Sequence, residues 1–154
     1  MPENESPPTT RSLKACDLPG LLDGASHGKG LGFNFLRHVK RCNVLTAVVD
    51  LTAGLKDDTR QRPWQQLQML RSELEAYQRG LSDKLALVIA NKSDEAHTSR
   101  AARALKRRTN LPVATVSAFK ESDFTDLKER LLRLADRGRM DDQHGLDDAV
   151  VAVS

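Results

Sequence analysis

Apolar residues along the chain fall into short unbroken runs separated by amphipathic stretches. Residues 44–51 and 85–90 are almost continuous aliphatic runs, and residues 112–116 form a shorter one. Such runs are typical of strands that are covered on both faces, as in a parallel sheet. We therefore predict three buried strands, preceded by a short apolar segment at residues 13–17 that runs into a Pro-Gly turn.

Helical periodicity occupies the stretches between these runs. Apolar side chains recur at steps of three and four between Pro63, which can open a helix, and Gly80, which can end it. Residues 98–108 predict a basic, alanine-rich helix, residues 122–134 a second amphipathic helix, and residues 33–39 a shorter helical stripe. Because strands and helices alternate, the pattern predicts an open α/β sheet flanked by helices.

Composition limits the class of protein without changing this picture. The chain has 154 residues, 39% of them apolar and 4% aromatic, so its core must consist mainly of Leu, Val and Ala. No run approaches the roughly 18 to 20 apolar residues of a membrane span, and the apolar runs argue against global disorder. The net charge of +3 is too small to indicate nucleic-acid binding by itself.

The two ends of the chain differ in composition from its middle. Residues 1–12 are rich in Pro, Thr, Glu and Ser, so we expect a disordered N-terminal segment that fits neither a secretory signal nor an Arg-rich transit peptide. Residues 137–154 are Asp- and Gly-rich with a weakly apolar end, and we expect a flexible tail there. Residues 13–136 are then expected to form one domain.

Polar or turn-forming segments directly follow three of the predicted strands. They are Asp17, Leu18, Pro19 and Gly20; Asn91, Lys92, Ser93 and Asp94; and Ser117, Ala118 and Phe119. Each alone is as well explained by a turn or a helix cap. In open α/β sheets, however, ligands bind beyond the carboxyl ends of the strands, so all three would face one rim. Their order matches the guanine-nucleotide-binding motifs of GTPases.

The side chains in these segments suit the recognition of guanine. The carboxylate of Asp94 can accept two parallel hydrogen bonds from guanine N1–H and the exocyclic amine, a donor pair that adenine lacks. Asn91 can bond the purine edge and tie neighbouring loops together, and the stem of Lys92 can lie along the base. Backbone N–H groups of Ser117 and Ala118 would face guanine O6. In the first segment, Asp17 would reach Mg²⁺ through water.

Residues 17–38, DLPGLLDGASHGKGLGFNFLRH, closely resemble the switch II region of the Obg family of GTPases, which assist ribosome assembly. The similarity continues through residues 39–51 and 63–94, where mitochondrial or other organellar members are the most similar. It covers about residues 13–134. The resemblance implies the G domain of a P-loop NTPase of the TRAFAC class, with GTP or GDP and Mg²⁺ as cofactors.

The resemblance also implies roles for residues that follow the first segment. The N–H of Gly20 would sense the γ-phosphate, because glycine lets the backbone approach closely. Leu21 occupies the place of a water-orienting Gln in Ras-like proteins and cannot hydrogen-bond a water. The resemblance therefore implies slow intrinsic hydrolysis, or a catalytic group supplied from elsewhere.

The phosphate-binding motif GxxxxGK[ST] is not found within these 154 residues. Gly28-Lys29-Gly30 lacks the required Ser or Thr, so we expect a G domain without its first strand, P-loop and first helix. Three lost charge-assisted hydrogen bonds would remove about 5–9 kcal/mol, whereas a micromolar site has about 8 kcal/mol in total. We therefore expect this chain alone to bind GTP weakly or not at all.

Two functions remain open on the sequence. The resemblance implies a GTP-binding switch in assembly of the large ribosomal subunit, with the subunit or its rRNA as partner, located in mitochondria or otherwise in the cytoplasm. The alternative is a nucleotide-free, GTPase-derived scaffold that binds the ribosome or RNA, or a fragment without function. The alternative is suggested by the basic residues within 100–108 together with Arg37, Lys40 and Arg41.

Overall fold

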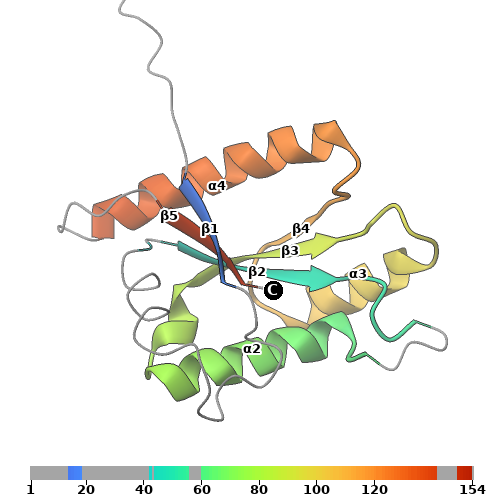
Figure 1. The fold of residues 1–154 in the computed structure, drawn as a ribbon, viewed down its shortest axis with the longest axis horizontal. Helices are drawn as coiled ribbons and strands as arrows, with labels where there is room; N and C mark the ends of the chain where they lie inside the picture. Colours follow the sequence, from blue (N-terminus) through green and yellow to red (C-terminus); the bar gives the residue numbers. More distant parts are fainter. Residues whose placement is uncertain (1–13, 19–41, 43, 56–59, 142–148, 154) are drawn as a thin grey trace, which may run out of the picture.

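The computed structural model describes residues 14–18, 42, 44–55, 60–141 and 149–153 of the chain (Figure 1). These residues form a parallel sheet with helices on both sides, which confirms the predicted α/β class. The strands lie in the order β1-β5-β2-β3-β4. Their bounds are β1 Lys14–Leu18, β2 Val44–Asp50, β3 Leu85–Asn91, β4 Val113–Thr115 and β5 Ala149–Val153.

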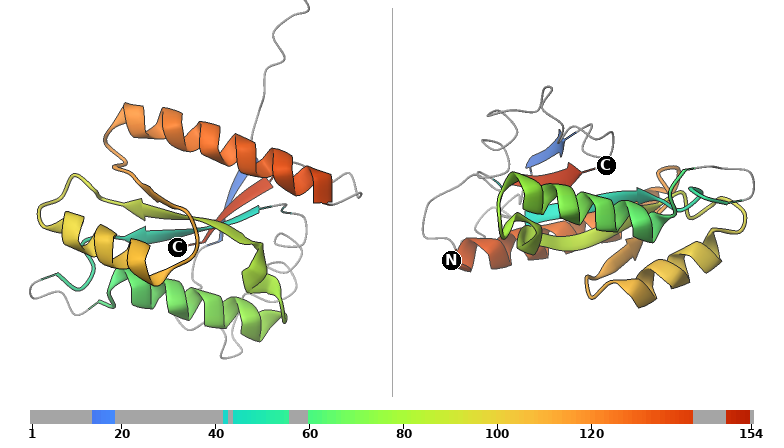
Figure 2. Two further views of the ribbon diagram at one scale, coloured as in Figure 1. Left: turned by 180° about the vertical axis from the view of Figure 1, so that it is seen from behind. Right: turned by 90° about the horizontal axis from the view of Figure 1, so that it is seen from below.

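In the described part of the chain, helices α2, α3 and α4 cover the two faces of the sheet (Figures 1 and 2). α2 (Pro63–Tyr77) and α3 (Thr98–Arg108) pack on one face, and α4 (Glu121–Asp141) lies on the other. A short 3₁₀ helix, η2 (Leu81–Lys84), links α2 to β3. Within the described part of the chain, no helix is long and apolar enough to cross a membrane.

Local chemistry explains where α2 begins and ends. Pro63 occupies its first turn, where a missing N–H costs nothing, and the Gln65 side chain accepts a hydrogen bond from the N–H of Arg62 at 3.0 Å. After the helix, Gly80 has a φ of +81°, a left-handed conformation that favours glycine. The N–H of Gly80 donates to Glu75 at 3.0 Å, which holds this turn against the helix.

The core is divided by the sheet into two clusters of unequal size. The larger cluster joins β2 and β3 to α2 and α3, and its fully buried members include Leu45, Leu74 and Leu105. Among the described residues the smaller cluster has four buried members, and it is completed by half-buried leucines of α4. Those buried members are Leu87, Ile89, Ala114 and Val116.

We expected a flexible tail over residues 137–154, but the structure has a helix up to Asp141 and a strand at residues 149–153. α4 continues to Asp141, past the predicted end at Leu134, because the intervening residues include no proline. Residues 149–153, AVVAV, form β5 and pair in parallel with both β1 and β2. The valine-rich segment suits a strand with neighbours on both edges. The predicted helical stripe at residues 33–39 lies outside the described residues.

Candidate functional site

The loops that follow β3 and β4 are joined by the side chain of Asn91. Its amide oxygen accepts the N–H of Lys92 at 2.8 Å and the N–H of Ala118 at 3.2 Å. A third bond runs from the N–H of Ser93 to the carbonyl oxygen of Val116 at 3.1 Å. Lys92 adopts a left-handed φ of +65°, which turns the chain sharply after the strand. Two of the three predicted segments are therefore fixed side by side.

Asp94 lies at the exposed end of this pair of loops. A hydrogen bond from the Ser117 hydroxyl, helped by the positive charge of Lys120, holds the pKa of the Asp94 carboxyl below its usual value. The carboxylate is therefore ionised at neutral pH and accepts hydrogen bonds. Ser117 is fully buried beside it. This arrangement provides an exposed acceptor on a positioned loop.

The backbone N–H groups of the second loop already have acceptors within the protein. The N–H of Ser117 donates to Oδ2 of Asp123 at 2.8 Å, and the N–H of Phe119 donates to the Ser117 hydroxyl oxygen at 3.2 Å. The N–H of Ala118 is bonded to Asn91. A purine oxygen would have to share or replace one of these acceptors. Ala118 is exposed whereas Ser117 is buried, so Ala118 is the better placed of the two predicted donors.

Asp50, at the end of β2, joins this site, although the sequence pattern did not single it out. Its carboxylate accepts hydrogen bonds from the N–H and hydroxyl of Thr52 at 2.8 and 2.6 Å. It also forms ion pairs with Arg60 at 2.7 Å and with Nζ of Lys92 at 2.8 Å. Burial alone would raise the pKa of Asp50, but the hydrogen bonds from Lys92, Thr52 and Arg60 outweigh it and hold that pKa well below its usual range.

These contacts direct the ammonium group of Lys92 toward β2. The side chain that was predicted to lie along a base is therefore anchored at its tip by Asp50. The signal that could have identified Asp50 is its position, because it ends a buried strand on the same edge of the sheet as Asn91. We refer to Asp50, Thr52, Arg60 and Lys92 as the Asp50 cluster.

The first predicted segment lies apart from the other two. Asp17 and Leu18 end β1, while Pro19, Gly20 and Leu21 lie outside the described residues. β5 and β2 separate β1 from β3, a distance of about 14 Å at the usual strand spacing of about 4.8 Å. Through the strand pairs, Leu18 is level with Val88, three residues before Asn91. The structure thus joins the second and third segments and sets the first at a distance.

No cluster of three His, Cys, Asp or Glu side chains that could hold a metal ion occurs in the part of the chain that the structure describes. The predicted role of Asp17 toward Mg²⁺ needs only one carboxylate acting through water. That role remains a prediction.

Comparison with known proteins places this site in a family context. No family model matches the chain. It is 44% identical over 126 residues to "Probable GTP-binding protein OBGM, mitochondrial" of Arabidopsis thaliana, which covers 81% of this chain and 26% of that protein. It is 37% identical over 121 residues to "GTPase Obg" of Mycoplasmopsis pulmonis, covering 78% and 28%.

A mitochondrial GTP-binding protein of Schizosaccharomyces pombe, named as uncharacterized, is 38% identical over 138 residues, which are 87% of this chain and 31% of that protein. The chain thus spans between a quarter and a third of the length of these relatives.

Proposed function

Because the chain belongs to the Obg family of GTP-binding proteins, we propose that the loops at residues 91–94 and 117–119 recognise the guanine base of GTP or GDP. The observation that carries this proposal is the pair of hydrogen bonds that the Asn91 side-chain oxygen accepts from the N–H groups of Lys92 and Ala118. It sets the two loops in one arrangement without a ligand. A pre-arranged site avoids the entropy of ordering two loops on binding.

Asp94 is the residue that would distinguish guanine from adenine. An exposed, ionised carboxylate accepts from guanine N1–H and the exocyclic amine at once, and such charge-assisted bonds are worth roughly 1.5–3 kcal/mol each. Adenine presents no matching pair of donors. The hydrogen bond from the buried Ser117 hydroxyl, which lowers the pKa of Asp94, supports this role because it holds the carboxylate in place on its loop.

Binding of nucleosides and monophosphates by the 154-residue chain tests this proposal. We expect millimolar GMP to shift the backbone amide resonances of residues 91–94 and 117–119 in ¹⁵N-correlated NMR spectra, and AMP to leave them in place. Asp94→Asn should lose the GMP response and gain a response to XMP, because the amide can donate to the 2-oxygen of xanthine. Asp83→Asn, at an exposed position in η2, is the matched control.

Equal shifts with GMP and AMP would refute base recognition by Asp94. A GMP response of Asp94→Asn as large as that of the unaltered chain would refute it as well. The use of monophosphates keeps the test independent of the phosphate-binding motif, which these 154 residues do not contain.

The phosphate side of the site is proposed from the family resemblance. Asp17 would hold Mg²⁺ through water and the N–H of Gly20 would bond the γ-phosphate, with Mg²⁺ neutralising phosphate charge. Leu21 provides no group that orients a water, so hydrolysis would be slow or would need a group supplied from elsewhere. Mg²⁺-dependent binding of GTP by this chain with micromolar affinity would contradict the weak binding that we expect of it.

A biological role follows from the same family membership. We propose that the protein acts as a GTP-controlled switch in assembly of the large ribosomal subunit, and that it works in mitochondria. The relatives from Arabidopsis thaliana and Schizosaccharomyces pombe are named mitochondrial, which supports the location. Tagged protein should co-sediment with large subunits from mitochondria when a non-hydrolysable GTP analogue is added. Co-sedimentation that is equal with GDP would contradict the switch.

A further inference from the structure

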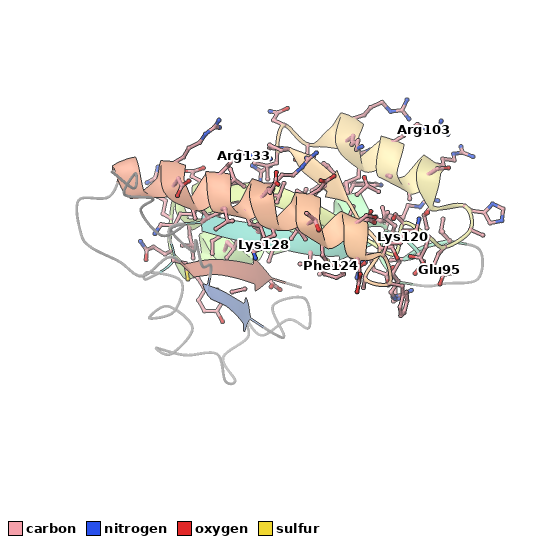
Figure 3. All side chains as sticks on the ribbon, turned by 90° about the horizontal axis from the view of Figure 1, so that it is seen from above. Glu95, Arg103, Lys120, Phe124, Lys128 and Arg133 are labelled. Carbon is pink, nitrogen blue, oxygen red and sulfur yellow. The ribbon has the colours of Figure 1, made fainter. Side chains whose placement is uncertain are left out.

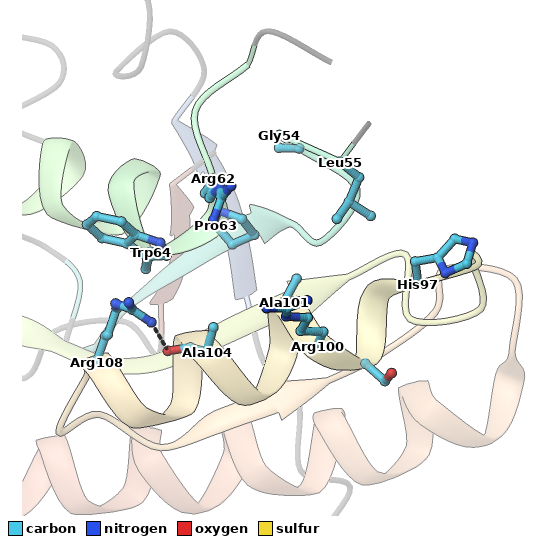
Figure 4. Close-up of a pocket in the computed structure, with 12 residues that line it drawn as sticks. Gly54, Leu55, Arg62, Pro63, Trp64, His97, Arg100, Ala101, Ala104 and Arg108 are labelled. Carbon is cyan, nitrogen blue, oxygen red and sulfur yellow. Dashed lines mark hydrogen bonds between the residues drawn. The ribbon is translucent and has the colours of Figure 1, made fainter. Parts of the chain in front are cut away.

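A groove lined by cationic side chains lies between the start of α2 and α3 (Figure 4). Its volume is about 540 Å³. We call it the α2–α3 groove and define it by Arg62, Trp64, His97, Ser99, Arg100 and Arg108; residues 53–55 also line it. None of the residues at 91–94 or 117–119 lines it.

The charge of the groove has one sign. Its ionisable lining residues in the described part of the chain are Arg62, Arg100, Arg108 and His97, with no carboxylate among them. α3 continues the same charge, because all five of its Lys and Arg residues are exposed and it has no acidic residue. Figure 3 shows Arg103 of this helix extending away from the sheet. A polyanion is therefore the ligand that this surface favours.

An aromatic ring that is half-buried against the core, Trp64, and the guanidinium group of the exposed Arg108 both line the groove. The guanidinium carbon of Arg108 lies 5.0 Å from the centre of the Trp64 ring, a cation–π arrangement between α3 and the start of α2. Arg108 is held further by a bond to the carbonyl oxygen of Ala104 at 3.5 Å (Figure 4). Aromatic rings and Arg guanidinium planes are the surfaces on which unpaired bases stack.

The distance along α3 between Arg100 and Arg108 is comparable with the length of a few linked nucleotides. Arg100 and Arg108 are eight residues apart on one helix, which corresponds to about 12 Å along its axis. Stacked nucleotides rise about 3.4 Å each along a strand, so this interval spans three to four of them.

We propose that the α2–α3 groove binds single-stranded RNA, with Arg100 and Arg108 holding phosphates and the Trp64–Arg108 pair receiving a base. An acidic peptide would match the charge, but it has no flat ring for the Trp64–Arg108 pair. Duplex RNA buries its bases in stacks and presents none to this pair. The proposal does not depend on guanine recognition, because the two sites share no residue.

Binding of a fluorescein-labelled 12-nucleotide oligouridylate to the 154-residue chain tests the proposal by fluorescence polarisation. We expect Arg100→Gln to weaken binding about 3-fold and Arg100→Gln/Arg108→Gln about 10-fold or more. Each lost phosphate contact should also reduce the slope of log K against log salt by about 0.7, so the double variant should lose about 1.4. Trp64 is the chain's single tryptophan, and its intrinsic fluorescence should be quenched by unlabelled RNA at saturation.

The matched control is Arg130→Gln/Arg137→Gln, which removes two exposed charges from α4 on the opposite face of the sheet. It should retain RNA binding within about 2-fold. Circular dichroism verifies that each variant folds. The double variant removes Arg108 and with it the Trp64–Arg108 pair, whereas Arg100→Gln keeps this pair, so the single variant tests the phosphate contact even if the double variant fails to fold.

Three results would overturn the proposal. The first is equal loss of affinity in the α3 and α4 variants, which would mean binding by net charge alone. The second is an unchanged Trp64 fluorescence at saturating RNA. The third is displacement of the RNA by a 12-residue oligoglutamate peptide at equal concentration, which would assign the groove to an acidic protein partner.

Discussion

The two faces of the sheet differ in how many described side chains they bury. On the α2–α3 face, fourteen of the described residues form one buried cluster shared by helices and strands, including Leu70, Leu74 and Leu105. On the α4 face, four of the described residues are buried and meet leucines that are only partly covered, and Phe124 is 48% exposed at the start of the helix. The difference indicates that, among the described residues, packing on the α2–α3 face contributes more to stability than packing under α4.

The surfaces proposed to bind ligands are distributed unevenly over the same two faces. The α2–α3 groove lies on the deeply packed face, and the Asp50 cluster ties the end of β2 to the loop after β3. α4 contributes Asp123, which accepts the N–H of Ser117 and so supports the second loop. The groove proposed to bind a ligand thus lies on the more densely packed elements, and such elements hold binding groups in place better than loops do.

The largest expected effect is the removal of a side chain from the deep face. Leu74→Ala deletes a fully buried side chain of α2 and should lower the free energy of unfolding by about 2–5 kcal/mol, since the cavity cannot close completely. Urea denaturation followed by circular dichroism measures it. A loss below about 1 kcal/mol would show that the two faces do not differ as described.

Replacement of the central carboxylate of the Asp50 cluster should have the next largest effect. Asp50→Asn removes the charge that pairs with Arg60 and Lys92, and we expect a loss of about 1–2 kcal/mol, because both partners are about half exposed. Thr52→Val is a control that keeps both ion pairs.

The same variant has a defined pH dependence. The folded-state pKa of Asp50 is lowered, so its contribution is fully present above the unfolded value of about 3.9 and declines as the pH falls below it. The stability difference between the chain and Asp50→Asn should therefore be constant from pH 5 to 7 and shrink toward pH 3. A difference that grows toward low pH would contradict the sign of the shift.

The matching deletion on the shallow face should cost less. Leu131→Ala removes a half-buried side chain of α4, and we expect a loss of about 1 kcal/mol, because the exposed side can rehydrate without leaving a closed cavity. The same urea titration applies. A cost equal to that of Leu74→Ala would mean that α4 is as deeply packed as α2.

The smallest effect should come from the surface of α4. Glu129 and Arg133 form an ion pair at 3.5 Å with both side chains 61% exposed. Glu129→Gln should change the free energy of unfolding by at most about 0.5 kcal/mol, and 0.5 M NaCl should remove the difference because exposed pairs are screened. A larger change would indicate that Glu129 has a role beyond this pair.

Features that depend on neighbouring residues could be predicted from the sequence. The aliphatic runs predicted the bounds of β2 and β3 to within one residue. Pro63 and the spacing of the leucines after it predicted α2. The pairing of the loops at 91–94 and 117–119 followed from the rule that parallel strands end at one edge.

Features that join distant residues could not be predicted in this way. Asp50 and Lys92 are 42 positions apart, and nothing near Asp50 indicates which cation it pairs with. The AVVAV segment of β5 lies beside an Asp- and Gly-rich stretch, and its strand character depends on the open edges of β1 and β2. The N–H groups of Ser117 and Ala118 were expected to face guanine O6. Their acceptors in the structure are Asp123 and Asn91, which lie outside the segment and could not be read from it.

The position of β5 has a consequence for how the chain folds. Lys14 pairs with Ala149, 135 positions along the chain, and the next pairs continue that span to Val153. Because contacts between distant residues must close large loops, such pairing slows folding. Among the described strands β1 pairs only with β5, so during synthesis β2, β3 and α2 can assemble before that partner of β1 has been made. We therefore expect refolding to show an early phase for the α2–α3 face and a slower phase in which β1 and β5 pair.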